Sequence, residues 1–179
     1  MTIALAPTPV LETERLTLRA PAARDWPAFD AFLSSPRADF IRSAGYDPQQ
    51  TWRAFGHVIG HWVLRGFGNF VFTLKGSERA LGMTGPWFPA GWPEQEIGWT
   101  VWDADSEGKG LCFEAAQAAR TYAYRTLGWT TAVSYVAPEN RRSAALAERL
   151  GARIDPEAAH PAGDKPCLVY RHPGPEVLA

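Results

Sequence analysis

Residues 99–114 read Trp-Thr-Val-Trp-Asp-Ala-Asp-Ser-Glu-Gly-Lys-Gly-Leu-Cys-Phe-Glu, a β-rich run followed by two glycines and the start of a helical pattern. Gly108 and Gly110 can adopt positive φ and carry no Cβ, so consecutive backbone N–H groups from Gly108 to Cys112 can point at one oxyanion. A helix that starts near Gly110 adds unpaired N–H groups and the positive end of its dipole, and Lys109 adds a full charge. The stretch therefore predicts a strand, a turn and a helix that bind a phosphate or pyrophosphate.

Two common phosphate-binding motifs do not fit this turn. A P-loop requires Lys and then Ser or Thr after its second glycine, where this chain has Leu111 and Cys112. A dinucleotide-binding fingerprint requires a third glycine three residues on and an acidic residue about 20 residues further; Phe113 and Thr131 occupy those positions. An ordinary strand-to-helix turn stays open as an alternative, because a lone Gly-x-Gly is a weak signal.

The segments on both sides of the turn form an ordered set. A second strand is predicted at 131–136, and Pro-Glu-Asn-Arg-Arg-Ser at 138–143 opens a helix that stops at Leu150-Gly151. Together with Thr-Glu-Arg-Leu-Thr-Leu-Arg at 13–19 and Glu-Ile-Gly at 96–98, this set resembles the GCN5-related N-acetyltransferases (GNAT). Within that family it is similar to the branch typified by the ribosomal-protein alanine N-acetyltransferases, RimJ and RimL.

The resemblance covers residues 11–172 and implies an α/β (α+β) fold. The central sheet would be mixed and mostly antiparallel, with helices on both faces and splayed central strands that bind acyl-CoA. The implied activity is that of an N-acetyltransferase that uses acetyl-CoA as co-substrate and moves the acetyl group to a primary amine by direct attack. The acceptor would be a protein N-terminus or a small-molecule amine, and a catalytically inactive acyl-CoA-binding or regulatory module is the alternative.

Composition and charge exclude several other classes of protein. With 179 residues, 46% hydrophobic and 21% charged, the chain suits one globular domain, 1–179. A net charge of −1 and an isoelectric point near 6.4 lack the basic excess that nucleic-acid binding needs. Cys112 and Cys167 are far apart, so we expect neither a disulfide framework nor a zinc site. The absence of a disulfide framework suits the reduced cytoplasm, and without an apolar run of about 18 residues no membrane contact is expected.

Two amphipathic helices are predicted after a first strand at 11–19. The first begins at the N-cap Asp25 and ends at Ser35-Pro36, and the second runs from Asp47-Pro48 to Gly66. Apolar residues recur at helical spacing in both. We therefore expect these helices to pack on a sheet.

His57 and His61 lie one turn apart on the second of these helices. In the GNAT family the helices between the first strands border the acceptor cleft, so the resemblance makes both histidines candidates for substrate binding. Two surface histidines on a polar face are the alternative. No metal is expected, because a third ligand and the His-Glu-x-x-His pattern are missing.

A β-hairpin is predicted from strands at 69–75 and 80–84. The following stretch, Gly-Pro-Trp-Phe-Pro-Ala-Gly-Trp-Pro at 85–93, is expected to interrupt the ladder, since prolines remove donors and glycines relax the backbone. Trp87 in this stretch is a candidate for the wall of the acceptor site. Packing against the sheet and a homodimer contact are the alternatives.

The central strand is predicted at 95–102, and a glycine at 98 suggests a bulge or a close backbone approach. In the GNAT family this strand splays from its neighbour. The resemblance therefore implies that backbone groups of Trp99, Thr100 and Val101 hold the pantetheine arm of the cofactor.

Glu96, near the start of this strand, matches the glutamate that precedes Ile-Gly in the resembling branch, and we expect it to be the general base. A partly buried carboxylate acts well in that role, because burial raises its pKa toward working pH. An exposed strand carboxylate beside Glu94 and Gln95 is the alternative.

Asn140 and Ser143 open the second helix of the implied acyl-CoA site. A simple N-cap, in which the Asn140 side chain meets the Ser143 N–H, is one interpretation. The resemblance adds another: the asparagine bonds the pantetheine, and the serine protonates the departing thiolate. Many relatives use a tyrosine one turn before the closing glycine, where this chain has Ala147, so water is the other candidate acid. A last strand is predicted at 167–171.

Overall fold

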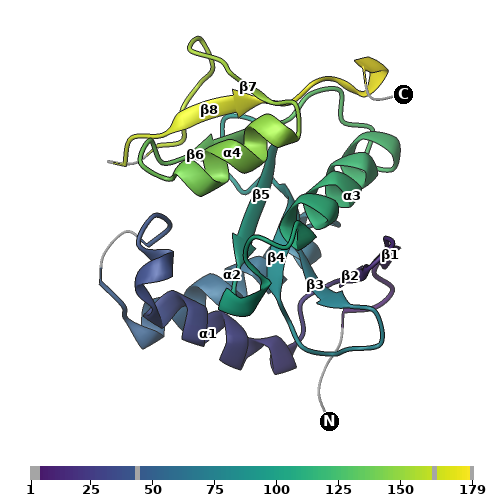
Figure 1. The fold of residues 1–179 in the computed structure, drawn as a ribbon, viewed down its shortest axis with the longest axis vertical. Helices are drawn as coiled ribbons and strands as arrows, with labels where there is room; N and C mark the ends of the chain where they lie inside the picture. The colour runs from purple at the N-terminus through teal and green to yellow at the C-terminus, as the bar shows by residue number, and fades with distance from the viewer. Residues whose placement is uncertain (1–4, 43–44, 163–164, 178–179) are drawn as a thin grey trace.

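The computed structural model describes residues 5–42, 45–162 and 165–177. Over these residues the strands form one sheet of order β1-β2-β3-β4-β5-β6-β8-β7 (Figure 1), and every neighbouring pair is antiparallel except β5 and β6. The strands are β1 (Leu11–Glu12), β2 (Leu16–Arg19), β3 (Phe70–Leu74), β4 (Gly82–Trp87), β5 (Glu96–Val101), β6 (Val133–Val136), β7 (Arg153–Ile154) and β8 (Leu168–Arg171). The α-helices are α1 (Trp26–Ser34), α2 (Pro48–Arg65), α3 (Leu111–Arg125) and α4 (Arg141–Arg149). The predicted fold class is confirmed.

The boundaries of α2 follow from its capping residues. The Asp47 carboxylate accepts hydrogen bonds from the N–H groups of Gln49 and Gln50, which satisfies donors that have no partner within the helix. Gly66 ends the helix at φ 75°, and its N–H bonds the Trp62 carbonyl. Both ends were predicted from these signals.

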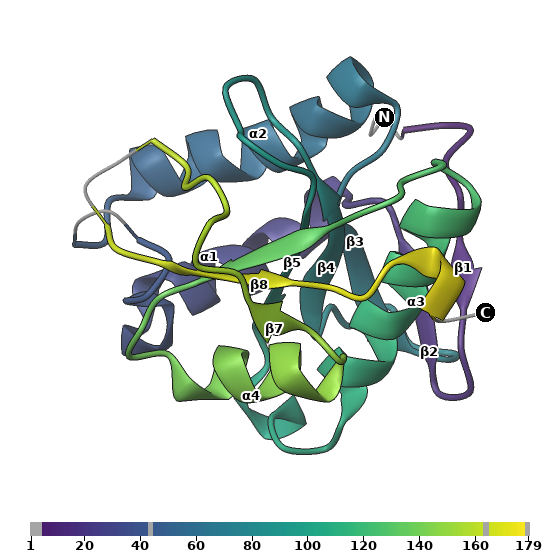
Figure 2. The ribbon, with the colours of Figure 1, turned by 90° about the horizontal axis from the view of Figure 1, so that it is seen from above.

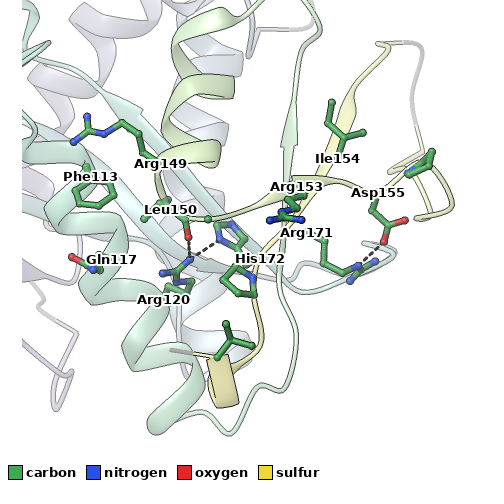
Figure 3. A pocket seen from close by; sticks show the side chains of 14 residues that line it. Phe113, Gln117, Arg120, Arg149, Leu150, Arg153, Ile154, Asp155, Arg171 and His172 are labelled. Carbon is green, nitrogen blue, oxygen red and sulfur yellow. Dashed lines mark hydrogen bonds and ion pairs between the residues drawn. The ribbon is translucent and has the colours of Figure 1, made fainter. Parts of the chain in front are cut away.

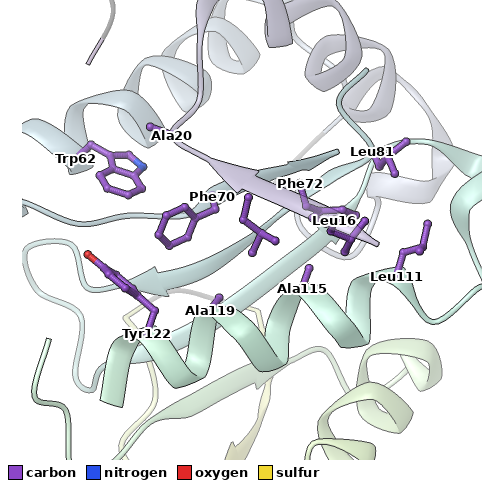
Figure 4. Close-up of a cluster of buried hydrophobic side chains, with 11 residues drawn as sticks. Leu16, Ala20, Trp62, Phe70, Phe72, Leu81, Leu111, Ala115, Ala119 and Tyr122 are labelled. Carbon is purple, nitrogen blue, oxygen red and sulfur yellow. The ribbon is translucent and has the colours of Figure 1, made fainter. Parts of the chain in front are cut away.

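One face of the sheet packs against α3. Small alanines on this helix let it approach the strands closely, and the aromatic and branched side chains of β2 and β3 fill the space between them (Figure 4). Phe70 and Tyr122 meet edge to face at 5.3 Å. The buried residues of this cluster include Leu16, Leu18, Phe70, Phe72, Leu111, Ala115, Ala119 and Tyr122. Here α3 is anchored directly beneath the central strands.

The opposite face packs against α1 and α2. Phe29 and Phe55, one from each helix, pack with their ring centroids 5.2 Å apart and their planes tilted by 44°, and Phe29 meets Trp102 edge to face at 5.4 Å. Val71 reaches this cluster from β3, whereas its neighbours Phe70 and Phe72 face α3, as the alternation of a strand requires. Seen along the sheet, α2 lies on one side, and α3 and α4 lie on the other (Figure 2).

The predicted interruption of the ladder at 85–93 is wrong for its first three residues. Gly85, Pro86 and Trp87 continue β4 and pair with β5 in unbroken register. The Trp102 N–H donates to the Leu81 carbonyl, and by alternation the nitrogen of Pro86 points away from β5, toward β3. Since β3 and β4 pair only up to the partners Phe70 and Thr84, the missing N–H of Pro86 costs no ladder bond.

The predicted bulge at Gly98 is also absent, because Gly98 pairs directly with Gly85. The strand parts from its neighbour in another way. β5 and β6 share a single register pair, Glu96 with Val133, and beyond it the two strands diverge. The splay implied by the resemblance is therefore present without a bulge.

Within the part of the chain that the structure describes, no helix is long and apolar enough to cross a membrane.

Candidate active site

The glycine turn has the predicted backbone geometry. Gly108 has φ 73° and Gly110 has φ 74°, which only glycine adopts readily. Gly110 is the N-cap of α3, and no side chain caps this helix end. The first-turn N–H groups from Leu111 and Cys112 onward are therefore available to an anion. Lys109 lies exposed in the turn.

Sequence reasoning missed a second cation at this turn. The Arg15 guanidinium donates to the Lys109 carbonyl at 3.1 Å, and a Cβ on Gly110 would lie 3.6 Å from Arg15 Nη2. Glu114 holds it in place, because its carboxylate accepts from Arg15 Nε at 2.6 Å and from the Thr13 hydroxyl at 2.5 Å. The 13–19 motif was visible in the sequence, but the Glu114 that Arg15 contacts lies 99 positions further along the chain.

Glu107 fixes the other side of the turn. Its carboxylate accepts from Arg37 and from Arg142, each at 2.5 Å. The same Arg37 guanidinium donates to the carbonyls of Val101 and Trp102 at 2.8 Å. These bonds hold the end of β5, the turn and α4 in a fixed arrangement.

The open edge of β5 presents fewer backbone groups than predicted. Since the Trp102 N–H bonds Leu81, alternation directs the N–H and C=O of Trp99 and Val101 toward the gap and those of Thr100 toward β4. The prediction that the Thr100 backbone holds the pantetheine arm is therefore wrong. Arg37 already occupies the Val101 carbonyl, which leaves both groups of Trp99 and the Val101 N–H.

Two side chains replace ladder bonds where the strands part. The Val133 N–H bonds the Gln95 carbonyl, so the next parallel bond would join the Tyr135 N–H to the Ile97 carbonyl. Instead, the Ser134 hydroxyl donates to the Ile97 carbonyl at 2.6 Å. The Glu96 carboxylate faces the Tyr135 N–H. Both backbone groups thus find partners although the ladder stops.

A buried polar chain supports Ser134 from behind. Its hydroxyl lies 2.9 Å from His172 Nε2, and His172 Nδ1 lies 3.1 Å from the Arg120 guanidinium, which also donates to the Leu150 carbonyl. Burial, with the Arg120 cation beside it, lowers the pKa of His172 to about 3, so the ring is neutral. Arg120, Leu150 and His172 line a hollow of about 750 Å³ between α3, the end of α4 and β7 (Figure 3). These hydrogen-bonded side chains link α3 and the end of α4 to the point where β5 and β6 diverge.

Asn140 and Ser143 stand at the start of α4. The Asn140 side-chain oxygen accepts from the Ser143 N–H at 3.2 Å, so the N-cap interpretation is confirmed. The Trp99 indole N–H donates to Ser143 Oγ at 3.3 Å across the gap between β5 and α4. Ser143 therefore keeps its own proton for a further acceptor.

Glu96 lies on the sheet face toward α1 and α2. The Trp92 indole N–H donates to its Oε2 at 2.8 Å. Burial raises the pKa of Glu96 from 4.5 to about 7, against the opposing effects of Trp92 and the Tyr135 N–H. Among the described residues, Glu96 forms no ion pair. A carboxyl with this pKa is poised to accept a proton near neutral pH.

Other groups near Glu96 are already engaged or lack a partner. Glu94 forms a two-bond ion pair with Arg171, at 2.8 and 2.9 Å, so it is not available as a base. The Tyr135 hydroxyl is buried without a hydrogen-bond partner among the described residues. Burial, with the nearby carboxylates of Glu94 and Glu96, raises its pKa. The hydroxyl therefore keeps its proton and can donate it in a hydrogen bond to a ligand.

His61 has a structural role. It is 2% exposed; its Nδ1 lies 2.8 Å from the Phe67 carbonyl, and its Nε2 accepts from the Phe88 N–H at 3.0 Å. Both ring nitrogens are thus used, which corrects the expectation that His61 binds substrate. Its ring stacks on Trp87 at 4.4 Å. The exposed His57 packs against the same indole at 4.9 Å, and Trp87 stands opposite Glu96 in the register.

Both cysteine thiols are weakly acidic, because burial raises their pKa. Burial raises the pKa of Cys112 to about 12. Cys167 lies 3.3 Å from His160 Nδ1, and its pKa is also raised by burial. Over the described ranges, no cluster of three or more His, Cys, Asp or Glu side chains is arranged to hold a metal ion.

A glycine turn at a helix start, an open strand edge and a carboxyl of raised pKa thus meet around one strand. A family model described as the acetyltransferase (GNAT) domain matches residues 15–153. The chain belongs to the GNAT acetyltransferase family. This GNAT assignment confirms the predicted family and its enzyme class.

Similar solved structures support the same assignment. An acetyltransferase from Agrobacterium tumefaciens str. C58 is 40% identical, with a TM-score of 0.84 over 96% of this chain and 98% of that one. A GnaT-family acetyltransferase from Bordetella pertussis is 25% identical, with a TM-score of 0.74 over 93% and 100% of the two chains. RimJ from Mycobacterium smegmatis, solved in complex with CoA-disulfide, shares the fold at 17% identity, with a TM-score of 0.73 over 97% and 90%.

Proposed function

We propose that this GNAT acetyltransferase transfers the acetyl group of acetyl-CoA to a primary amine by direct attack. The observation that carries the proposal is that Glu96, whose pKa is about 7, lies where β5 and β6 begin to diverge. The open edge of β5 and the glycine turn lie further along the same chain segment. A thioester held along this edge would have the carboxyl close to an amine that approaches from the α1–α2 side.

The proposed binding of acetyl-CoA uses mainly backbone groups. The pyrophosphate lies against the N–H groups from Gly108 to Cys112, with Lys109 and Arg15 as the nearby cations. The pantetheine amides bond the free N–H and C=O of Trp99 and the Val101 N–H. Asn140 offers its side-chain amide to the same arm. Use of acyl-CoA by the family and the CoA complex of a RimJ neighbour support acetyl-CoA as the co-substrate.

In the proposed reaction, the amine nitrogen bonds the thioester carbon and the C–S bond breaks. Glu96 takes the proton that the nitrogen loses, and the departing thiolate takes a proton from Ser143 or from water. No covalent enzyme intermediate is needed. Orientation of the two reactants supplies much of the rate, and proton transfer supplies the rest.

The pKa of Glu96 favours one class of amine. An α-amine has a pKa of about 8 and a lysine amine about 10.4, so proton transfer to a carboxylate of pKa about 7 is uphill by roughly one unit in the first case and more than three in the second. We therefore place the α-amine of a peptide N-terminus first among acceptors, ahead of small-molecule amines.

A screen of acceptors with acetyl-CoA, read as free thiol released, tests the proposal. We expect an alanine-initiated hexapeptide to be acetylated faster than free alanine, spermidine or an aminoglycoside. Thiol release that no amine accelerates above the rate of acetyl-CoA hydrolysis would overturn the proposal. In that case, retained CoA binding by calorimetry would indicate an acyl-CoA-binding module.

A further inference from the structure

The α1–α2 face of the sheet contains a methyl-sized space above Gly98. Gly98 pairs with Gly85 across β4 and β5, so two adjoining positions on this face carry no side chain. Asn69 immediately precedes β3, and extending the β3–β4 register by one residue places it beside Gly85. Asn69, Gly85 and Gly98 thus form a row across three strands. Glu96 lies two residues from Gly98 along β5, on the same face.

Two oxygens face this space. A Cβ built on Gly98 would lie 3.5 Å from Glu96 Oε1 and 3.9 Å from Asn69 Oδ1. Asn69 is 6% exposed, and its Oδ1 is buried with no hydrogen-bond partner among the described residues. A buried amide oxygen without a donor is costly. A ligand that brings a donor to this space would satisfy it.

The backbone holds Asn69 in this position. The Trp62 indole N–H donates to the Asn69 carbonyl at 3.0 Å. A Cβ on Gly85 would lie 3.2 Å from Asn69 Cα, so the absence of a side chain at Gly85 allows the close approach. The backbone of Asn69 is therefore fixed beside Gly85, and its side chain is buried on this face.

We infer that Asn69 and Glu96 together bind the acceptor nitrogen above Gly98 and select primary amines. The inference rests on the proposed function and adds the specificity-determining residue. A neutral primary amine has two N–H groups, one for each oxygen, and keeps its lone pair for the thioester. A secondary amine has one N–H and places a carbon against the second oxygen, which then stays without a donor.

The test compares the primary amine that the wild-type protein acetylates fastest with its N-methyl derivative. For a peptide acceptor these are hexapeptides initiated by alanine and by N-methylalanine. We expect wild-type kcat/KM to favour the primary amine by roughly 10- to 100-fold, the range expected when a buried acceptor is left unmet. Asn69→Leu should reduce this preference to about threefold or less, while Asn69→Asp, which keeps an acceptor oxygen, should retain most of it.

Thr73, which lies on β3 and on the same face of the sheet as Asn69, provides a matched control. Thr73 is 2% exposed and lies four residues from Asn69, so Thr73→Val removes a buried polar group without touching the space above Gly98. We expect it to leave the preference for the primary amine unchanged. A loss of preference in Thr73→Val equal to that in Asn69→Leu would overturn the inference, because it would reflect general weakening of β3.

A second variant fills the space directly. Gly98 does not have a positive φ, and an added Cβ would make only ordinary contacts of 3.5 Å and more, so Gly98→Ala should fold. We expect KM for the amine to rise by roughly tenfold or more and CoA affinity, measured by calorimetry, to stay at the wild-type value. This variant decides the matter even if Asn69→Leu does not fold.

The outcomes separate the inference from the proposed function. If the wild-type protein acetylates no amine, the proposed function fails, and the inference fails with it. If Glu96→Gln impairs acetylation while Asn69→Leu and Gly98→Ala keep the wild-type KM and amine preference, only the inference is overturned.

Discussion

The two sides of β5 are built in different ways. On the side of α3 and α4, one continuous stretch from the strand edge to the glycine turn offers backbone groups. On the side of α1 and α2, the site consists of side chains from separate segments: Asn69, Trp92, Glu96 and Tyr135. Backbone sites depend on chain geometry, whereas side-chain sites change with single substitutions. In the proposed function, binding of the co-substrate is thus separated from recognition of the acceptor.

The largest expected effect is on the acceptor side. Glu96→Gln keeps the shape of the side chain but cannot take a proton, so kcat/KM for the amine should fall by about 10²- to 10⁴-fold at pH 7. CoA affinity should not change, because the substitution lies on the other side of the strand. Steady-state kinetics and calorimetry measure the two quantities. Glu148→Gln, an exposed carboxylate on α4, is the control and should behave as wild type.

The second prediction concerns CoA binding at the glycine turn. Gly110→Asp adds a Cβ at φ 74° and a negative charge where the pyrophosphate is expected, so CoA affinity should fall by about 100-fold or more. Gly76→Asp carries the same backbone strain at φ 75° in a remote turn and is the matched control. A folded Gly110→Asp protein with undiminished CoA affinity in calorimetry would refute the assignment of the turn.

Ser143 stands between the two sides, and its effect should be smaller. Ser143→Ala should lower kcat by about tenfold at most, because water can also protonate a departing thiolate, and should change CoA affinity little. Ser143→Thr keeps the hydroxyl and should retain most of kcat. Loss of CoA affinity without a fall in kcat would assign Ser143 to binding alone.

The smallest effect is on stability. The pKa of Glu96 is about 7 in the folded state and 4.5 as its ordinary value. The stability from this raised pKa is therefore fully present below pH 4.5 and is lost as pH rises through 7. Glu96→Gln does not titrate, so its melting temperature relative to wild type should rise between pH 5 and pH 8. A difference that stays constant over this range would mean that the folded-state pKa is not raised.

Local signals in the sequence predicted much of the co-substrate side. Asp47 and Gly66 marked the ends of α2, and the glycines at 108 and 110 marked the turn with its positive φ angles. These signals work because caps and turns depend on residues within a few positions of one another. The continuation of β4 through Pro86 was missed, because a proline is tolerated there only when its nitrogen faces away from the paired strand β5, and the sequence does not show this direction.

The acceptor side was largely invisible in the sequence. Asn69 matters because of Gly85 and Gly98, and Ser134 matters because of Ile97 and His172, none of which is near it in the chain. Such partners are set by sheet register and by packing between elements. Glu96 was found only through its resemblance to a family motif, and its pKa follows from burial that no local pattern reports.

The pH dependence of kcat/KM for wild type and Glu96→Gln tests most directly the claim that the α1–α2 side activates the amine. Glu94, Tyr135 and Cys167 also lie near this carboxyl, but Glu94 is paired with Arg171, and burial raises the pKa of the other two. For a peptide acceptor, the wild-type acidic limb should show two ionisations, one at about 7 from Glu96 and one at about 8 from the α-amine. Glu96→Gln should lose the lower one and keep the upper. Superimposable profiles for the two proteins would contradict the account.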